Sequence, residues 1–134
     1  MKPIELYEKK LNNTFRDRQL LVTAVTHSSY ANEQKGKCDS YERLEFLGDS
    51  ILGFVTARYL FENFPELSEG ELTKTRAALV CERSLCGFSK KLGVGEFLRL
   101  SHGKQHSGGR ARARILAGVV ESTLAALSLH RGRL

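Results

Sequence analysis

Apolar residues recur at helical spacing along most of this chain, and no stretch alternates as a half-buried strand does. In the segment 18–27, for example, Leu21, Ala24 and Val25 fall on one stripe. The pattern predicts helices at residues 3–11, 18–27, 41–64, 68–81, 82–92 and 112–129. The polar, glycine-containing segments 30–40 and 101–109 are predicted to be loops. We therefore predict an all-α fold with a single domain over residues 1–134.

Three local signals fix the boundaries of these helices. Pro65 ends the longest predicted helix, because proline cannot continue the backbone hydrogen-bond pattern. Ser68 followed three residues later by Glu71 has the form of a capping box at a helix start. Gly93 is the residue type that usually follows the last turn of a helix.

The composition narrows the class of protein. The chain has 134 residues, of which 41% are hydrophobic and 27% charged, which is typical of a globular domain and excludes collagen-like or low-complexity sequence. Its apolar runs are too short to span a bilayer, and no apolar signal segment follows Met1. Three cysteines without CxxC spacing favour neither a zinc site nor a disulfide framework. We expect a cytoplasmic protein with no membrane partner.

The positive charge is concentrated at the end of the chain. The formal net charge is +6, and residues 97–134 hold seven Lys and Arg residues but one acid, Glu121. Residues 1–96 therefore balance to zero, and the segment 97–120 contains no acidic side chain. Such a segment attracts a polyanion, although a solvated basic loop is an equally good interpretation of the charge alone.

Acidic side chains gather on one face of the longest predicted helix. Glu42, Glu45 and Asp49 are spaced at i, i+3 and i+7, so they share that face. Two like charges about 5.5 Å apart repel by about 3 kcal/mol at an effective dielectric constant of about 20. A bound divalent cation would cancel this repulsion, and oxygen ligands suit Mg²⁺ or Mn²⁺. The ordinary alternative is a solvated acidic stripe with local salt bridges.

Two further residues favour the metal-site interpretation. A glycine inside a helix, such as Gly48, costs about 1 kcal/mol relative to alanine and indicates close approach of another backbone. Glu121 lies among apolar residues of the last predicted helix, where a carboxylate needs a partner or a metal. Together they predict a carboxylate cluster shared by two helices, beside a basic segment.

The stretch 42–50, with the sequence ERLEFLGDS, resembles the signature of the ribonuclease III family, the Mg²⁺-dependent endonucleases that cut double-stranded RNA. Other family-like stretches follow the same order along the chain: THSSYANE at 26–33, FP at 64–65, EG at 69–70, RA at 76–77, LV at 79–80, LRL at 98–100 and SGG at 107–109. The resemblance extends over essentially the whole chain.

The resemblance implies a helical endonuclease domain that works as a homodimer and accepts duplex RNA in a valley between its subunits. It implies that Glu45, Asp49 and Glu121 hold Mg²⁺, or Mn²⁺ as a substitute. It also implies that Glu42 and Glu69 assist catalysis. The products would carry 5′-phosphate and 3′-hydroxyl ends, and no small-molecule cofactor is implied.

Other positions matched by the resemblance concern the interface and the RNA. Phe46 matches an aromatic residue that inserts into a socket on the partner subunit, although an ordinary core role is the alternative. Arg76, Arg110 and Arg112 are the candidate RNA-binding residues. Arg110, Arg112 and the nearby Arg114 could line the RNA side or only solvate the start of the final helix. Duplex RNA is recognised by shape and by phosphate contacts, so we expect binding without sequence preference.

Two departures from the family pattern bear on activity. Gly118 stands where the family has a metal-ligating Asp, so this position has no side-chain oxygen and weakens the helix by about 1 kcal/mol. The double-stranded-RNA-binding domain that usually follows is absent from the sequence, which fits a shortened chain, a degenerate paralogue or a naturally short protein.

Three interpretations of function follow. The first is an endoribonuclease for duplex RNA, impaired by Gly118. The second is a catalytically inactive module that binds double-stranded RNA or dimerises on the same scaffold, and the glycine favours it for this chain. The third, a helical DNA-binding domain, rests only on the basic segment.

Overall fold

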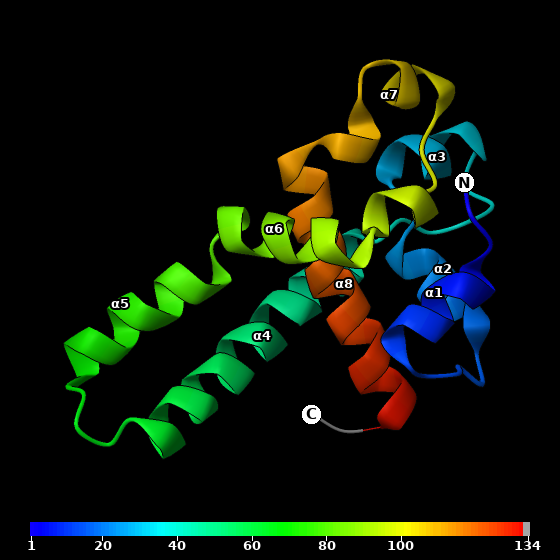
Figure 1. Ribbon diagram of the computed structural model, residues 1–134. Helices are drawn as coiled ribbons and strands as arrows, with labels where there is room; N and C mark the ends of the chain where they lie inside the picture. The colour runs from blue at the N-terminus through cyan, green and yellow to red at the C-terminus, as the bar shows by residue number, and fades with distance from the viewer. Residues whose placement is uncertain (133–134) are drawn as a thin grey trace.

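The computed structural model describes residues 1–132, and this part of the chain is helical with no named strand (Figure 1). In chain order the elements are α1 (Ile4–Leu11), α2 (Arg18–Ala24), α3 (Ser28–Glu33), α4 (Glu42–Asn63), α5 (Glu69–Val80), α6 (Glu82–Leu92), the 3₁₀ turn η1 (Val94–Phe97), α7 (His102–His106), the 3₁₀ turn η2 (Gly109–Ala111) and α8 (Ala113–Arg131). The predicted all-α class is confirmed. No helix among the described residues has the length and apolar character needed to cross a membrane.

The predicted boundaries of the long helices are confirmed to within two residues. α4 ends at Asn63, before Pro65. The capping box at the start of α5 is complete, because Glu71 N–H donates to Ser68 Oγ over 3.2 Å and Ser68 N–H donates to Glu71 Oε1 over 2.9 Å. Gly93 follows α6 with a φ of +67°, the left-handed conformation that glycine adopts without strain.

Both predicted loops contain a short helix, so that prediction was wrong in detail. α3 falls largely within the segment 30–40, and its first turn is capped by His27, whose Nδ1 accepts from Ser29 N–H over 3.0 Å. α7 falls within 101–109 and is capped by Ser101, whose Oγ accepts from Lys104 N–H over 3.1 Å. These helices are too short and polar to produce a periodic apolar pattern, so only their caps could have indicated them.

The second predicted helix, 18–27, ends early at Ala24 because the next residues pair with a distant backbone segment. Arg99 N–H donates to Val25 O over 2.9 Å, and His27 N–H donates to Arg99 O over 3.0 Å. An isolated parallel bridge joins Thr26 to Arg99 at this point. A tertiary contact therefore overrides the local helical periodicity.

α8 is the central helix of the molecule and packs against α2, α4 and α6 (Figure 1). Its apolar side meets the core near Tyr7, whose ring stacks on Phe97 with centroids 4.9 Å apart. The Tyr7 hydroxyl reaches α8 through a 2.7 Å hydrogen bond with Thr123 Oγ1. α4 and α5 form a long arm that extends away from this body (Figure 1).

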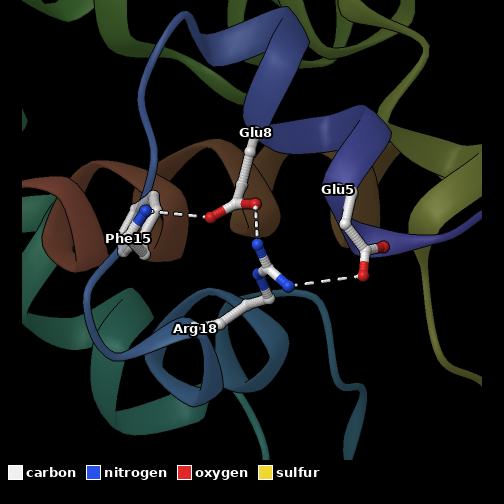
Figure 2. Close-up of polar contacts among 4 residues, drawn as sticks. All are labelled: Glu5, Glu8, Phe15 and Arg18. Atoms are coloured by element: carbon white, nitrogen blue, oxygen red, sulfur yellow. Dashed lines mark hydrogen bonds and ion pairs between the residues drawn. The ribbon is translucent and has the colours of Figure 1, made fainter.

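A nearly buried carboxylate, Glu8, fastens α1 to the loop that follows it (Figure 2). Its Oε2 accepts from Phe15 N–H over 2.9 Å, and its Oε1 lies 3.0 Å from Arg18 Nη2. Arg18 also reaches the exposed Glu5 over 3.4 Å (Figure 2). The segment before α2 is thus held against α1.

Candidate active site

A hollow of about 440 Å³ lies where α4, α8 and the start of α6 meet, and we call it the carboxylate hollow. It is lined by Glu42, Glu45, Phe46, Asp49, Val80, Glu82, Leu85, Arg114, Ala117, Gly118 and Glu121. The structure therefore brings together four predicted carboxylates, those of Glu42, Glu45, Asp49 and Glu121, with the predicted substitution at Gly118.

Gly48 sets the position of the two helices that carry these carboxylates. A Cβ atom on Gly48 would overlap the backbone carbonyl of Glu121, so any other residue here would push α8 away from α4. The predicted close approach of a second backbone at Gly48 is confirmed. Because Glu45 and Asp49 flank Gly48 on the same helix, this contact places them beside Glu121.

The pKa values of Glu45 and Glu121 are raised, because these two carboxyls are partly buried beside other acids. Burial, a hydrogen bond with Asp49 and the negative charges of Asp49 and Glu45 raise the pKa of Glu121 to about 8. Burial also raises the pKa of Glu45, although the nearby Arg114 guanidinium acts in the opposite direction. Near neutral pH, the Glu121 carboxyl therefore retains its proton and hydrogen-bonds to Asp49.

The donor chemistry of the hollow fits a hard divalent cation, since oxygen ligands are what Mg²⁺ and Mn²⁺ prefer. Within residues 1–132, however, no three His, Cys, Asp or Glu side chains are arranged to hold a metal ion as they stand. The Asp49 and Glu121 carboxyls bond each other, and the Glu45 carboxylate is directed to Gly118. The ligand set predicted from the sequence requires these side chains to turn.

Gly118 leaves a space that the Glu45 side chain occupies. A Cβ atom on Gly118 would overlap Glu45 Oε2 and would lie 3.6 Å from the Tyr41 hydroxyl. Burial and the charge of Glu45 raise the pKa of Tyr41 to about 12, so its hydroxyl remains protonated. A carboxylate at position 118 would compete with Glu45 for this space.

Four further predicted residues do not line the carboxylate hollow: Glu69, Arg76, Arg110 and Arg112. Glu69 and Arg76 line a separate hollow of about 310 Å³ between α4 and α5. Arg110 braces the backbone by donating through Nη1 to Gly95 O over 3.0 Å and to Leu98 O over 2.6 Å. This structural role for Arg110 was not predicted from the sequence.

Phe46 is the most exposed large aromatic residue of α4, with 79% of its surface accessible. It contributes to the carboxylate hollow and to a larger one of about 1020 Å³, whose lining includes Leu20, Leu47 and Leu129. The alternative of an ordinary core position for Phe46 is excluded in this single chain. Its predicted contact with a partner subunit stays a prediction.

Tyr41, whose hydroxyl lies beside Gly118, was not singled out from the sequence as a site residue. Arg114, which lines the hollow, was named from the sequence only as a basic residue that could face the RNA or solvate the start of the last helix. Arg114 precedes Gly118 by four residues and Glu121 by seven, so helical spacing alone places all three on one face of α8. That spacing is the signal that could have identified it.

Comparison with known proteins agrees with this architecture. A ribonuclease-III-like family model matches residues 17–134. Ribonuclease 3 of Bacillus cereus is 47% identical over 129 residues, which is 96% of this chain and 53% of the relative. Ribonuclease 3 of Caldanaerobacter subterraneus is 50% identical over 125 residues, or 93% of this chain and 55% of the relative. The chain thus spans about half the length of these curated relatives.

Solved structures show the same fold. The nuclease domain of ribonuclease III from Campylobacter jejuni matches with a TM-score of 0.88 and 39% identity, over 98% of this chain and 86% of that one. A second structure of that domain, which concerns flexibility in its region of dimer formation, gives a TM-score of 0.90 at 38% identity, over 97% and 87% of the two chains. On the family match, the sequence identity and the shared fold, this chain belongs to the ribonuclease-III-like family.

Proposed function

We propose that this chain is an endonuclease domain that cleaves double-stranded RNA, leaving 5′-phosphate and 3′-hydroxyl ends, with activity reduced by Gly118. The observation that carries the proposal is the convergence of Glu45, Asp49 and Glu121 in one hollow, at the backbone contact between Gly48 and α8. The names of the matched relatives support the same activity.

In this proposal Glu45, Asp49 and Glu121 hold Mg²⁺, or Mn²⁺ in its place. A divalent cation supplies charge that polarises a phosphodiester and lowers the pKa of a water molecule. Glu121 loses its proton when it acts as a ligand, so binding of the cation is coupled to proton release. Gly118 contributes no oxygen, and the affinity for the cation is correspondingly lower.

The proposed active form is a homodimer that binds duplex RNA. Phe46 presents an exposed ring next to the hollow lined by Leu20, Leu47 and Leu129, which offers an apolar surface for a second copy. Dimer formation in the Campylobacter jejuni nuclease domain supports this assembly. Two copies would place two carboxylate hollows along one duplex, as the staggered cuts of the family require.

The test is cleavage of an end-labelled RNA duplex with Mg²⁺ and then with Mn²⁺, using the natural sequence and Gly118→Asp. We expect the aspartate to raise the rate in Mg²⁺ by about tenfold or more, because it adds a ligand for the cation. Gly118→Asn is the matched control, since it has nearly the same volume without the charge. Equal rates for Gly118→Asp and the natural sequence in Mg²⁺ would contradict an impairment caused by Gly118.

A second candidate function is a catalytically inactive module that binds duplex RNA or dimerises. The Glu45 carboxylate occupies the space beside Gly118 into which a side chain at position 118 would extend. This arrangement favours the inactive module, because Glu45 fills the space without adding an oxygen ligand to the site. If both the natural sequence and Gly118→Asp bind the duplex and neither cuts it, this second function replaces the first.

A further inference from the structure

Arg114 is the one Lys or Arg side chain among the described residues that line the carboxylate hollow. The other charged groups of that lining are all acidic: Glu42, Glu45, Asp49, Glu82 and Glu121. A phosphodiester carries a negative charge, so its approach to this lining is repelled everywhere except at Arg114.

The guanidinium of Arg114 is available to a ligand, in contrast to those of its neighbours in the sequence. Arg110 is engaged by the carbonyls of Gly95 and Leu98, and Arg112 Nη2 donates to Ser107 O over 3.0 Å. Arg114 is exposed and makes no hydrogen bond or ion pair with any residue in the part of the chain that the structure describes. All of its donors are therefore free.

The position of Arg114 on α8 directs its charge into the hollow. It lies in the first turn of α8, where the helix dipole favours an acid over a base. It is on the same face as Gly118 and Glu121, and its field reaches the Glu45 carboxyl, whose pKa it lowers against the effect of burial. Its charge therefore acts inside the hollow.

We propose that Arg114 binds a phosphate of the RNA backbone and holds it beside Glu45, Asp49 and Glu121. The planar guanidinium can donate two parallel hydrogen bonds to the oxygens of one phosphate, which fixes both its position and its orientation. The inference rests on the proposed function, because it assumes that duplex RNA enters the carboxylate hollow. Of the three arginines that the sequence offered for RNA contact, it assigns the phosphate contact in the hollow to Arg114, because Arg110 and Arg112 are engaged by backbone carbonyls.

The experiment measures binding rather than cleavage, so it is independent of activity. A fluorescent RNA duplex is titrated with the natural sequence and with R114Q in EDTA, over a series of salt concentrations. We expect R114Q to bind about tenfold more weakly. The logarithm of the binding constant decreases as the logarithm of the salt concentration rises. We expect R114Q to make this dependence shallower by about 1 in slope for each protomer bound, as for loss of one phosphate contact.

Two variants serve as controls. R114K retains one positive charge and should keep the salt slope while losing part of the affinity, because an ammonium lacks the planar pair of donors. R16Q removes the same charge from an exposed position next to Phe15, which packs on His130 near the opposite end of α8. That end is about 24 Å from Arg114 along the helix axis, so R16Q should bind like the natural sequence.

A neutral methylphosphonate, placed at each phosphate of the duplex in turn, locates the contact. At the phosphate held by Arg114, we expect the substitution to weaken binding to the natural sequence about tenfold and to leave binding to R114Q unchanged. Equal affinity and salt slope for R114Q and the natural sequence would overturn the inference and leave the proposed function intact. Absence of duplex binding by the natural sequence in EDTA would also overturn the inference. Absence of both this binding and cleavage in Mg²⁺ or Mn²⁺ would overturn the proposed function as well.

Discussion

Gly48 and Gly118 lie on the two helices of the carboxylate hollow, but they face different kinds of atom. A Cβ atom on Gly48 would meet the backbone of Glu121, which cannot move without displacing α8. A Cβ atom on Gly118 would meet the end of the Glu45 side chain, which can rotate. The first glycine is therefore required by the fold, and the second is not.

This difference predicts opposite effects of the same substitution. Gly48→Ala should destabilise the protein by more than about 2 kcal/mol, since it overpacks a backbone contact. Gly118→Ala should be neutral or stabilising by up to about 1 kcal/mol, because alanine has the higher helix propensity. Urea denaturation followed by circular dichroism measures both, and equal losses of stability in the two variants would contradict the distinction.

At the residue scale, the sequence predicted which carboxylates meet but not how they are arranged. The spacing of Glu42, Glu45 and Asp49, with Gly48 among them, was enough to predict a second helix bearing Glu121 beside them. The rotation of the Glu45 carboxylate toward Gly118 depends on side-chain packing, which sequence spacing does not encode. The hydrogen bonds from Arg110 depend on where the fold places the carbonyl groups of Gly95 and Leu98. No pattern in the sequence indicates the direction of these carbonyl groups.

At the scale of elements, prediction succeeded where a helix is long or carries a strong stop signal. α4, α5 and α6 have such signals in Pro65, the capping box at Ser68 and Gly93. α3 and α7 have six and five residues, which is too short for apolar periodicity to be recognised. Side-chain caps and contacts with neighbouring segments support them instead.

The cap of α3 makes its stability depend on pH. His27 Nδ1 must be unprotonated to accept from Ser29 N–H. Burial lowers the pKa of His27, and Lys104 and Arg112 act in the same direction while Glu42 opposes them. The cap is therefore fully formed above the unfolded-state pKa of about 6.5, and its contribution is lost as the pH falls through the lower folded-state pKa.

His27→Asn tests this dependence, because an asparagine can cap a helix without titrating. The melting temperature of the natural sequence should fall more steeply between pH 7 and pH 5 than that of the variant. The quantity compared is the slope of the melting temperature against pH. Absolute melting temperatures differ for a second reason, because the variant also loses the contact between the His27 and Tyr41 rings. Parallel curves for the two proteins would exclude His27 as the titrating group.

At the scale of the whole molecule, the exposed ring of Phe46 provides a test of the proposed homodimer. Phe46→Ala should raise the dissociation constant of the proposed homodimer about 10²- to 10⁴-fold, because each of the two subunits loses the roughly 1.5–3 kcal/mol gained when a Phe side chain is buried. Sedimentation equilibrium measures the constant directly. Phe88→Ala is the control, because Phe88 is 54% exposed on α6 and lines neither hollow that contains Phe46.

An unchanged dissociation constant in Phe46→Ala would remove this residue from the interface, and a monomeric natural sequence would exclude the dimer. The single-chain fold was predictable from helix periodicity and from the family resemblance. The proposed homodimer was predicted only from the family resemblance. The helical periodicity of a single chain does not indicate which apolar residues a second copy would cover.

The central position of α8 also has a consequence for synthesis of the protein. α2, α4 and α6 all pack against α8, and the contact between Gly48 and Glu121 joins segments more than seventy residues apart. Because a ribosome delivers the chain from its N-terminus, the faces that these three helices turn to α8 stay uncovered until α8 has emerged. We therefore expect the nascent chain to rely on chaperones at this stage, and the carboxylate hollow to form only after translation has passed α8.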